Sequence, residues 1–423
     1  MKLKAMTNLI VLAIATLAIV SCGGSSEKTT STAPTTAASS PVATTATTAT
    51  AGDGVNTTEL ARRVVTDSAR IKPGDVVVIN GGKHTIPLME AIAIEAQKAG
   101  GMVTMFLNSD RVMRSQNIDV PEKYLEQKPV FFAEWLKQMD VYIGLPGAED
   151  FKAIIADVPE ARFAKAAQAG QIITDMLNGA KVRLVSIGYP SKQEAENNKL
   201  DFASYEKMHW AAVNADYRQI AEKGEQLKKL LQGAKQVRVT SPSGTDVSFA
   251  VTNRPVFVMG GVVSEQASKE KFFLSRIASL PGGSLTLAPL ETSVNGKVVV
   301  PKATCRYEPL TDASYEFKNG KLENFKAGKG ADCLNQTMAA YTGPKDMFGS
   351  FSIGLNPALK VIEDGGDYRP SDAAGMIYVG IGDNQMLGGS NKVQGQGGYG
   401  FPVVKATVAI DGKVVVKDGQ LVL

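Results

Sequence analysis

Two kinds of hydrophobic pattern divide the chain near residue 232. From Val55 to about Gln232, short runs of apolar and β-branched residues alternate with longer segments in which apolar positions recur at helical spacing. Short buried strands that alternate with helices are typical of a parallel sheet covered on both faces. The expected strands are residues 75–80, 102–107, 140–145 and 182–187, and the expected helices are residues 86–99, 131–138, 163–177 and 205–231. The pattern therefore predicts an α/β domain over residues 55–232.

From Gln236 onward, alternating or branched runs are separated by Asn-Gly and Asp-Gly pairs. Such pairs suit type I′ hairpin turns, because both central residues of that turn need a positive φ. The pairs lie at residues 295–296, 319–320, 411–412 and 418–419. The last two predict a terminal meander with strands at residues 405–410, 413–417 and 420–423. We therefore expect residues 233–423 to form an antiparallel, β-rich α+β domain.

Residues 1–21 have the features of an export signal. Lys2 and Lys4 precede an apolar run, residues 9–20, which is too short to span a bilayer and suits the apolar core of a signal peptide. The run leads to Cys22 and resembles a bacterial lipobox, which implies cleavage before the cysteine and acylation of its sulfur. The alternative is an uncleaved signal anchor with an incidental cysteine.

Residues 22–54 consist mainly of Ser, Thr and Ala and cannot build a packed core. The sequence therefore predicts a flexible tether that holds the folded body to a membrane through a lipid at Cys22. This places the protein in the bacterial cell envelope, facing either the periplasm or the surface. In an oxidising compartment Cys305 and Cys333 either form a disulfide or are two unrelated thiols.

Composition and charge narrow the classes of function. Apolar residues make up 44% of the chain and charged residues 21%, as in an ordinary globular protein. The net charge of +4 includes two lysines of the signal, so no nucleic-acid-binding surface is predicted. The chain has only two histidines, His84 and His209, which disfavours metal or triad chemistry that needs several imidazoles.

Acidic residues are the remaining candidates for chemistry. Glu291 lies before one of the Asn-Gly pairs, and Asp383 lies in the glycine-rich segment Gly380-Ile-Gly-Asp-Asn384. Asp383 is either an acid placed at a cleft or the first residue of an Asx-type turn, in which the carboxylate accepts from its own backbone.

Several motifs in the second half resemble one enzyme family. They are Leu280-Pro-Gly-Gly-Ser-Leu-Thr-Leu-Ala-Pro289, Glu291-Thr-Ser-Val-Asn-Gly296, Ser243-Gly-Thr-Asp-Val-Ser-Phe249, Ser352-Ile-Gly-Leu-Asn-Pro357 and Gly380-Ile-Gly-Asp-Asn384. In order and spacing they are similar to the aminopeptidase T family of thermophilic metallo-aminopeptidases. The segment Ile71-Lys-Pro-Gly-Asp-Val-Val-Val-Ile-Asn80 resembles the opening domain of that family. The resemblance covers residues 57–423.

The resemblance implies a site with two divalent metal ions, held by two glutamates, two histidines and an aspartate and assisted by a tyrosine. The matching positions in this chain carry other residues. The five positions that match metal ligands are Ser284, Ser350, Tyr378, Gly398 and Gly400, and the assisting tyrosine matches Gln385. Neutral hydroxyl groups and glycines do not offset the charge of two divalent cations.

Two functional hypotheses follow. The favoured one is a membrane-tethered, non-catalytic relative that binds a peptide or small ligand in the old substrate cleft and needs no cofactor. Glu291, Asp383 and Gln385 are then candidate cleft residues. The alternative is an active aminopeptidase that removes N-terminal residues with a remodelled site for two divalent metals. The resemblance also implies a possible homodimer.

Overall fold

The structure is a computed structural model, and it describes residues 50–51, 55–179, 181–270, 272–306, 308–363, 368–394 and 398–423. The expected signal, Cys22 and most of the tether lie outside the described residues. At the start of the described part, β1 (Thr50–Ala51) pairs with β2 (Val55–Asn56). None of the described helices is long and apolar enough to cross a membrane.

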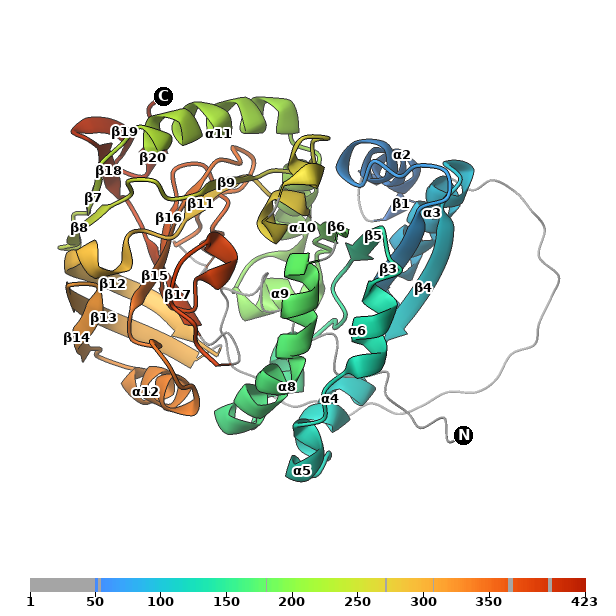
Figure 1. The fold of residues 1–423 in the computed structure, drawn as a ribbon, viewed down its shortest axis with the longest axis horizontal. Helices are drawn as coiled ribbons and strands as arrows, with labels where there is room; N and C mark the ends of the chain where they lie inside the picture. Colours follow the sequence, from blue (N-terminus) through green and yellow to red (C-terminus); the bar gives the residue numbers. More distant parts are fainter. Residues whose placement is uncertain are drawn as a thin grey trace.

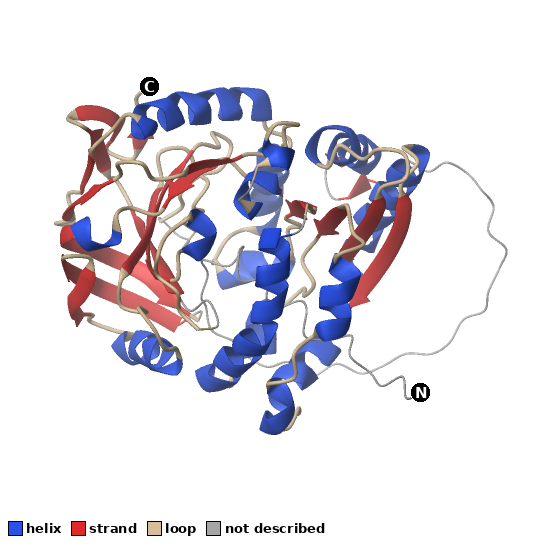
Figure 2. Ribbon diagram, viewed as in Figure 1, coloured by secondary structure: helices blue, strands red, loops and turns tan. Residues whose placement is uncertain are grey.

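A five-stranded parallel sheet forms the first part of the molecule (Figures 1 and 2). Its strands run in the order β10-β6-β5-β3-β4, and they are β3 (Val76–Gly82), β4 (Met102–Asn108), β5 (Val141–Gly144), β6 (Arg183–Ile187) and β10 (Ile277–Leu280). The parallel α/β sheet predicted from the sequence is confirmed. Its edge strand β10 comes from residues beyond 232, so the chain returns to this sheet after starting the second part.

Helices connect the strands of this sheet. They are α2 (Thr57–Arg63), α3 (Ile86–Lys98), α4 (Asp110–Ile118), α5 (Glu122–Leu125), α6 (Val130–Leu136), α7 (Phe151–Ile155), α8 (Glu160–Gly179), α9 (Lys192–Asn197), α10 (Phe202–Val213) and α11 (Tyr217–Gln232). The last of them, α11, packs instead against the second part of the molecule (Figure 1). The prediction of one helix over residues 205–231 is wrong, because the chain breaks at Asn214 and starts again as α11. The carboxylate of Asp216 accepts from the backbone N–H groups of Arg218 and Gln219, which caps a new helix at this point.

Two antiparallel sheets form the second part, as predicted. The smaller sheet has the order β17-β16-β15-β11-β9. Its strands are β9 (Val256–Met259), β11 (Ser284–Leu287), β15 (Phe348–Gly354), β16 (Ile377–Gly382) and β17 (Gly398–Val403). The larger sheet has the order β14-β13-β12-β8-β7-β18-β19-β20. Its strands are β7 (Gln236–Thr240), β8 (Asp246–Ala250), β12 (Asn295–Cys305), β13 (Glu308–Lys318), β14 (Lys321–Lys326), β18 (Thr407–Ile410), β19 (Lys413–Lys417) and β20 (Gln420–Leu421).

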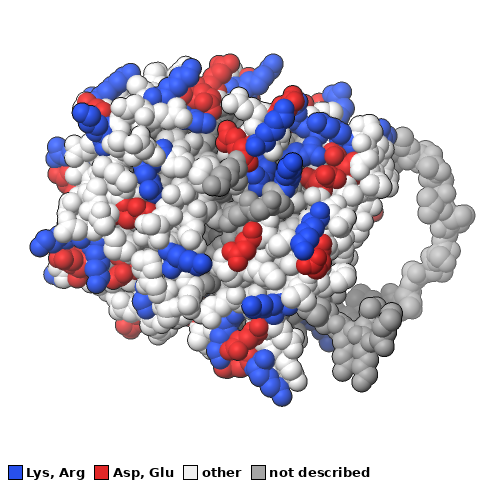
Figure 3. All heavy atoms as spheres, in the orientation of Figure 1, with Lys and Arg blue, Asp and Glu red and all other residues white. Residues whose placement is uncertain are grey.

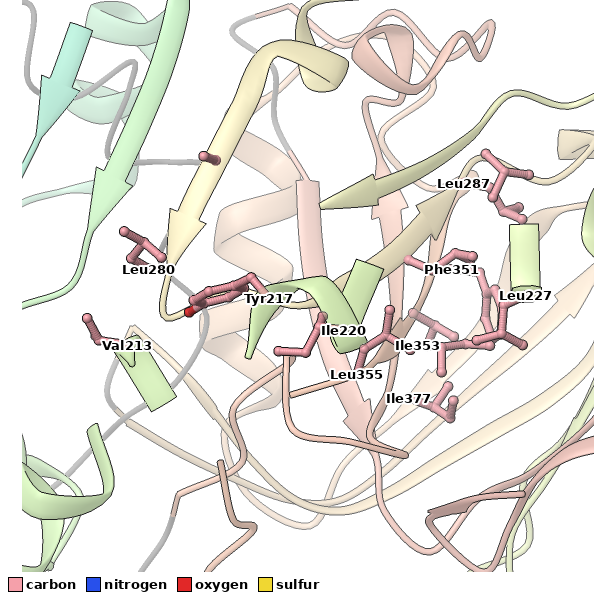
Figure 4. Packing of buried hydrophobic residues seen from close by; sticks show 14 of the residues in the cluster. Val213, Tyr217, Ile220, Leu227, Leu280, Leu287, Phe351, Ile353, Leu355 and Ile377 are labelled. Carbon is pink, nitrogen blue, oxygen red and sulfur yellow. The ribbon is translucent and has the colours of Figure 1, made fainter. Parts of the chain in front are cut away.

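The core of this part lies between the two sheets. Alternate residues of β11 and β15, including Leu287, Phe351 and Ile353, are fully buried on the inner face (Figure 4). The Phe351 ring packs 5.1 Å from that of Phe249 on the larger sheet. Helix α11 adds Leu227 to the same hydrophobic cluster. Since strand side chains alternate between faces, the residues next to these in sequence lie on the opposite, outer face of the smaller sheet.

Three of the four predicted turns are confirmed. Asn319-Gly320, Asp411-Gly412 and Asp418-Gly419 join consecutive strands, and every one of these residues has positive φ. The prediction of a turn at Asn295-Gly296 is wrong, because both residues begin β12. Gly296 pairs with strands on both sides, and a Cβ there would lie 2.2 Å from the carbonyl oxygen of Asp246. Glycine is needed at this position for close approach of a neighbouring strand.

A disulfide joins Cys305 at the end of β12 to Cys333 in α12 (Ala331–Ala340). Of the two possibilities that the sequence left open, the structure therefore has the paired form.

The neighbouring residue Arg306 connects this region to the first part of the molecule. Its guanidinium donates to the carbonyl oxygens of Ile155 and Val158 and lies 3.3 Å from the carboxylate of Glu160.

Candidate functional site

The five positions expected to match metal ligands all lie in the smaller antiparallel sheet. Directly paired residues of an antiparallel sheet share a face, and so do alternate residues of one strand. Ser350 pairs with Gly380, and Gly380 pairs with Gly400. Following this register through the sheet places all five on its outer face: Ser284, Ser350, Tyr378, Gly398 and Gly400. The register thus brings together residues that are up to 116 positions apart in the sequence.

Small and hydroxyl-bearing residues dominate this outer face. The hydroxyl of Ser352 donates to that of Thr286 at 2.8 Å, which in turn donates to the carbonyl oxygen of Phe351. Tyr378 is buried and packs in a small apolar cluster. In contrast, Ser350 and Gly400 are partly exposed. The face therefore offers neutral hydrogen-bonding groups and a strip of glycines.

Asp372 adds a carboxylate to one end of this face. It lies in the loop before β16, and it shares a hydrogen bond with the side chain of Ser284. Burial raises the pKa of Asp372, and the hydrogen bond from Ser284 only partly opposes that rise. Sequence reasoning missed this residue, because nothing in its local sequence points to a serine 88 positions earlier. Only the end of β15, which pairs with β11, brings the two together.

Glu291 lies beyond the other end of β11, in a buried polar network. Its Oε1 atom accepts from Arg254 Nη2 at 3.1 Å, from Asn384 Nδ2 at 3.0 Å and from the backbone N–H of Ser390 at 2.7 Å. The pKa of Glu291 is lowered overall, since these hydrogen bonds and the charge of Arg254 outweigh the effect of burial. The carboxylate is thus occupied in joining the loop after β16 to the end of β11.

Asp383 forms an Asx-type turn. Its Oδ1 accepts from the backbone N–H of Gln385, two residues on, and its Oδ2 accepts from the N–H of Val393. Burial raises the pKa of Asp383, while these two backbone hydrogen bonds oppose the rise. The side chain of Gln385 is exposed. Of the two roles considered for Asp383, the structure therefore favours the turn.

Comparison with known proteins identifies the scaffold. A sequence profile described as thermophilic metalloprotease (M29) matches residues 55–358, which is well over half of the chain. The chain belongs to the M29 family. A comparison with curated proteins finds no match.

Solved structures agree with the M29 assignment at the level of the fold. Wild-type AmpT from Thermus thermophilus is similar with a TM-score of 0.66 and 14% identity, over 87% of this chain and 99% of AmpT. A 2,5-dihydroxypyridine dioxygenase from Pseudomonas putida KT2440 is similar with a TM-score of 0.56 and 15% identity, over 87% of this chain and 97% of the dioxygenase. Because a protein named as a dioxygenase shares the fold of this M29 chain, the fold alone does not specify the chemistry.

The residues of this M29 chain do not fit the pair of divalent metal ions that the family implies. Within the described ranges, no three His, Cys, Asp or Glu side chains form a group able to hold a metal ion. Gly398 is also unsuited to replacement by a ligand-bearing residue. A Cβ at Gly398 would lie 2.9 Å from the carbonyl oxygen of Ile381, so a side chain there requires a shift of the backbone. We therefore derive no reaction step through a metal.

The two histidines come from segments outside the smaller sheet. His84 follows β3, and burial lowers its pKa while the carboxylates of Glu149 and Asp110 oppose that effect. His209 is in α10, where burial lowers its pKa to about 4. Neither ring nitrogen of His209 has a hydrogen-bond partner of good geometry among the described residues. These positions agree with roles in packing rather than in metal binding.

Proposed function

We propose that this M29 chain binds a peptide or another small ligand on the outer face of the smaller sheet and does not hydrolyse it by metal-dependent chemistry. One observation carries the proposal. The register places all five ligand-matching positions on a single face, yet those positions hold two serines, a tyrosine and two glycines. This supports a site that keeps the family's arrangement of positions without metal-binding side chains.

The groups on the outer face of the smaller sheet suit a ligand that is neutral and polar, such as the backbone of a peptide. Hydroxyl groups at Thr286 and Ser352 both donate and accept hydrogen bonds. Gly400, which is partly exposed, lets a ligand approach the strands closely, because it carries no Cβ. The buried carboxyl of Asp372 marks one end of the face and offers an additional polar contact. These are the features of a binding surface that orients a ligand rather than activating water.

The proposal includes attachment to a membrane. Acylation of Cys22 and a tether over residues 22–54 would hold the folded body at the bacterial cell envelope, since each buried methylene of a lipid chain contributes roughly 0.8 kcal/mol. Labelling of the expressed protein with a radioactive fatty acid tests this part. Label is expected in the full chain and is expected to be lost in the Cys22→Ser variant.

Metal stoichiometry tests the loss of the family chemistry. The purified protein is equilibrated with zinc, cobalt or manganese, freed of loosely held ions and analysed by mass spectrometry, with AmpT treated in parallel. We expect no tightly held ion in this chain and no release of amino-terminal residues from a panel of short peptides. Two ions per chain together with turnover that stops on chelation would contradict the proposal and support the alternative, an active aminopeptidase.

Ligand binding tests the role of the face. Binding of a panel of di- and tripeptides is measured by calorimetry for the wild type and for Gly400→Leu. A Cβ at Gly400 makes only ordinary contacts, the nearest at 3.5 Å from the Tyr378 ring, so the larger side chain is expected to cover the face without unfolding the sheet. The affinity of any peptide that binds should fall about tenfold or more, which corresponds to ~1.4 kcal/mol.

The matched control is Gly233→Leu, which places the same side chain on an exposed glycine just after α11. This variant should bind as the wild type does. Equal affinities for the wild type and Gly400→Leu would show that the ligand binds elsewhere.

A further inference from the structure

One edge of the outer face of the smaller sheet is apolar. Strand β9 forms that edge and lies beside β11. Met259 of β9 pairs with Ser284, and Phe257 pairs with Thr286. Directly paired residues of an antiparallel sheet share a face, so Phe257 and Met259 lie on the outer face beside two hydroxyl groups.

The packing of β9 agrees with this register. Its other two residues, Val256 and Val258, pack with the core between the two sheets. In contrast, Phe257 and Met259 pack with a second hydrophobic cluster. The alternation along β9 therefore places one pair of side chains on each face of the sheet.

Two short 3-10 helices bring further apolar side chains to this edge. They are η4 (Phe273–Arg276) and η6 (Gln385–Leu387), and they contact one another. The ring of Phe272, just before η4, lies 5.3 Å from that of Phe257. The side chains from β9 and these two segments make up what we call the apolar edge: Phe257, Met259, Phe272, Met386 and Leu387.

The apolar edge is partly open to solvent. Phe257 is buried, but Met259, Phe272 and Met386 are only partly buried. Apolar area that water still contacts favours binding of a ligand that covers it.

The surroundings of the apolar edge present no charge for a ligand to pair with. The one charged residue of η4, Arg276, is 3% exposed, and it donates to the backbone carbonyl oxygens of Glu270 and Leu177. On the side of the molecule seen in Figure 3, charged side chains are scattered over the middle of the second part and do not gather into a patch of one sign. The edge therefore suits an uncharged, apolar group.

We propose that the ligand of the outer face is a peptide with a large apolar side chain, and that the apolar edge binds this side chain. The inference rests on the proposed function and adds the class of ligand to it. Adjacent strands lie about 4.8 Å apart, so a peptide backbone placed over Thr286 and Ser352 has β9 within reach of one extended side chain. Met259 and Met386 have flexible thioethers, which adapt to apolar groups of different shape. Leucine, methionine and phenylalanine are thus all suitable.

Peptide pairs that differ in one side chain test the apolar edge. Calorimetry on the full chain in detergent measures the binding of alanine tripeptides that carry leucine or asparagine at one position, taking each position in turn. Leucine and asparagine have similar shapes, so the ratio of their affinities reports the burial of apolar surface. At one position of the tripeptide we expect leucine to bind about tenfold or more tightly than asparagine.

Two variants assign this preference to the apolar edge. Met386→Gln and Met259→Gln each place an amide among its apolar side chains, and each is expected to lower the ratio about threefold or more. Circular dichroism checks that they are folded, and either variant is sufficient if the other does not fold. The matched control is Met338→Gln in α12, because Met338 is also partly buried but packs against the core between the two sheets. Its ratio should equal that of the wild type.

The outcomes separate this inference from the proposed function. If leucine and asparagine peptides bind equally well, or if both glutamine variants keep the wild-type ratio, the inference is overturned and ligand binding on the outer face stands. Gly400→Leu should weaken both peptides of a pair together, because it covers the face and not the apolar edge. If no peptide binds the wild type, this inference fails together with the proposed binding of peptides.

Discussion

Replacing Glu291 by alanine is expected to lower the free energy of unfolding by roughly 3–5 kcal/mol, because it leaves a buried guanidinium without its carboxylate. Arg254 and Glu291 are only 12% and 10% exposed at their side chains, so water replaces little of the lost interaction. The substitution also removes an acceptor from Asn384 and from the backbone N–H of Ser390. Denaturation by guanidinium chloride, followed by tryptophan fluorescence, measures the change.

The matched control is Glu316→Ala on β13. That carboxylate is about half exposed and lies 3.9 Å from Lys297, so its removal should change stability by no more than about 1 kcal/mol. If Glu291→Ala costs no more than this control, the carboxylate is not a structural group. Glu291 would then again be a candidate for ligand binding, and peptide affinity would be the property to measure in the variant.

Acidification is expected to destabilise the fold through His209. In the unfolded chain its pKa is near 6.5, whereas burial lowers it to about 4 in the native protein. Between these values the unfolded chain holds a proton that the native chain does not, so stability falls as the pH decreases through this range. The full difference corresponds to about 3 kcal/mol, most of which is expected to be lost by pH 4.

Comparison with His209→Phe isolates this contribution. Phenylalanine preserves an aromatic ring between Tyr205 and Trp210, whose rings lie 5.8 and 5.6 Å from that of His209. Subtracting the stability curve of the variant from that of the wild type removes the effects of other groups, including Asp372, whose raised pKa acts in the opposite direction. If the difference in free energy of unfolding between the wild type and His209→Phe does not change between pH 7 and pH 4, His209 does not cause the loss of stability in acid.

Much of the fold follows from local sequence. The alternation of apolar strands with helical segments predicted the parallel sheet, and the predicted strand at residues 102–107 differs from β4 by one residue. The pairs Asp411-Gly412 and Asp418-Gly419 located the terminal meander, because their positive φ angles suit glycine and aspartate. These features depend on a few neighbouring residues, so they can be read before any contact between distant segments is known.

At other positions, tertiary packing gave a structure that differs from the one predicted by the local sequence. Asn295-Gly296 has the sequence of a turn, but Gly296 instead allows β8 to lie close to β12. Strand β10 joins the parallel sheet from beyond the change in pattern at residue 232, because residues 277–280 pair with β6. Hydrophobic periodicity indicates that a strand is buried. It does not indicate which strand lies beside it in the sheet.

The candidate site also has some features that follow from the sequence and others that depend on the tertiary structure. From the sequence alone comes the prediction that the positions expected to match metal ligands carry serine, tyrosine and glycine, because it depends only on the residue at each position. Tertiary structure decided that these positions share one face, that Asp372 joins Ser284, and that Glu291 is occupied by Arg254. The physical reason is that strand register and side-chain burial bring together residues that are far apart in the sequence. The number of residues between two positions does not determine how close they lie in space.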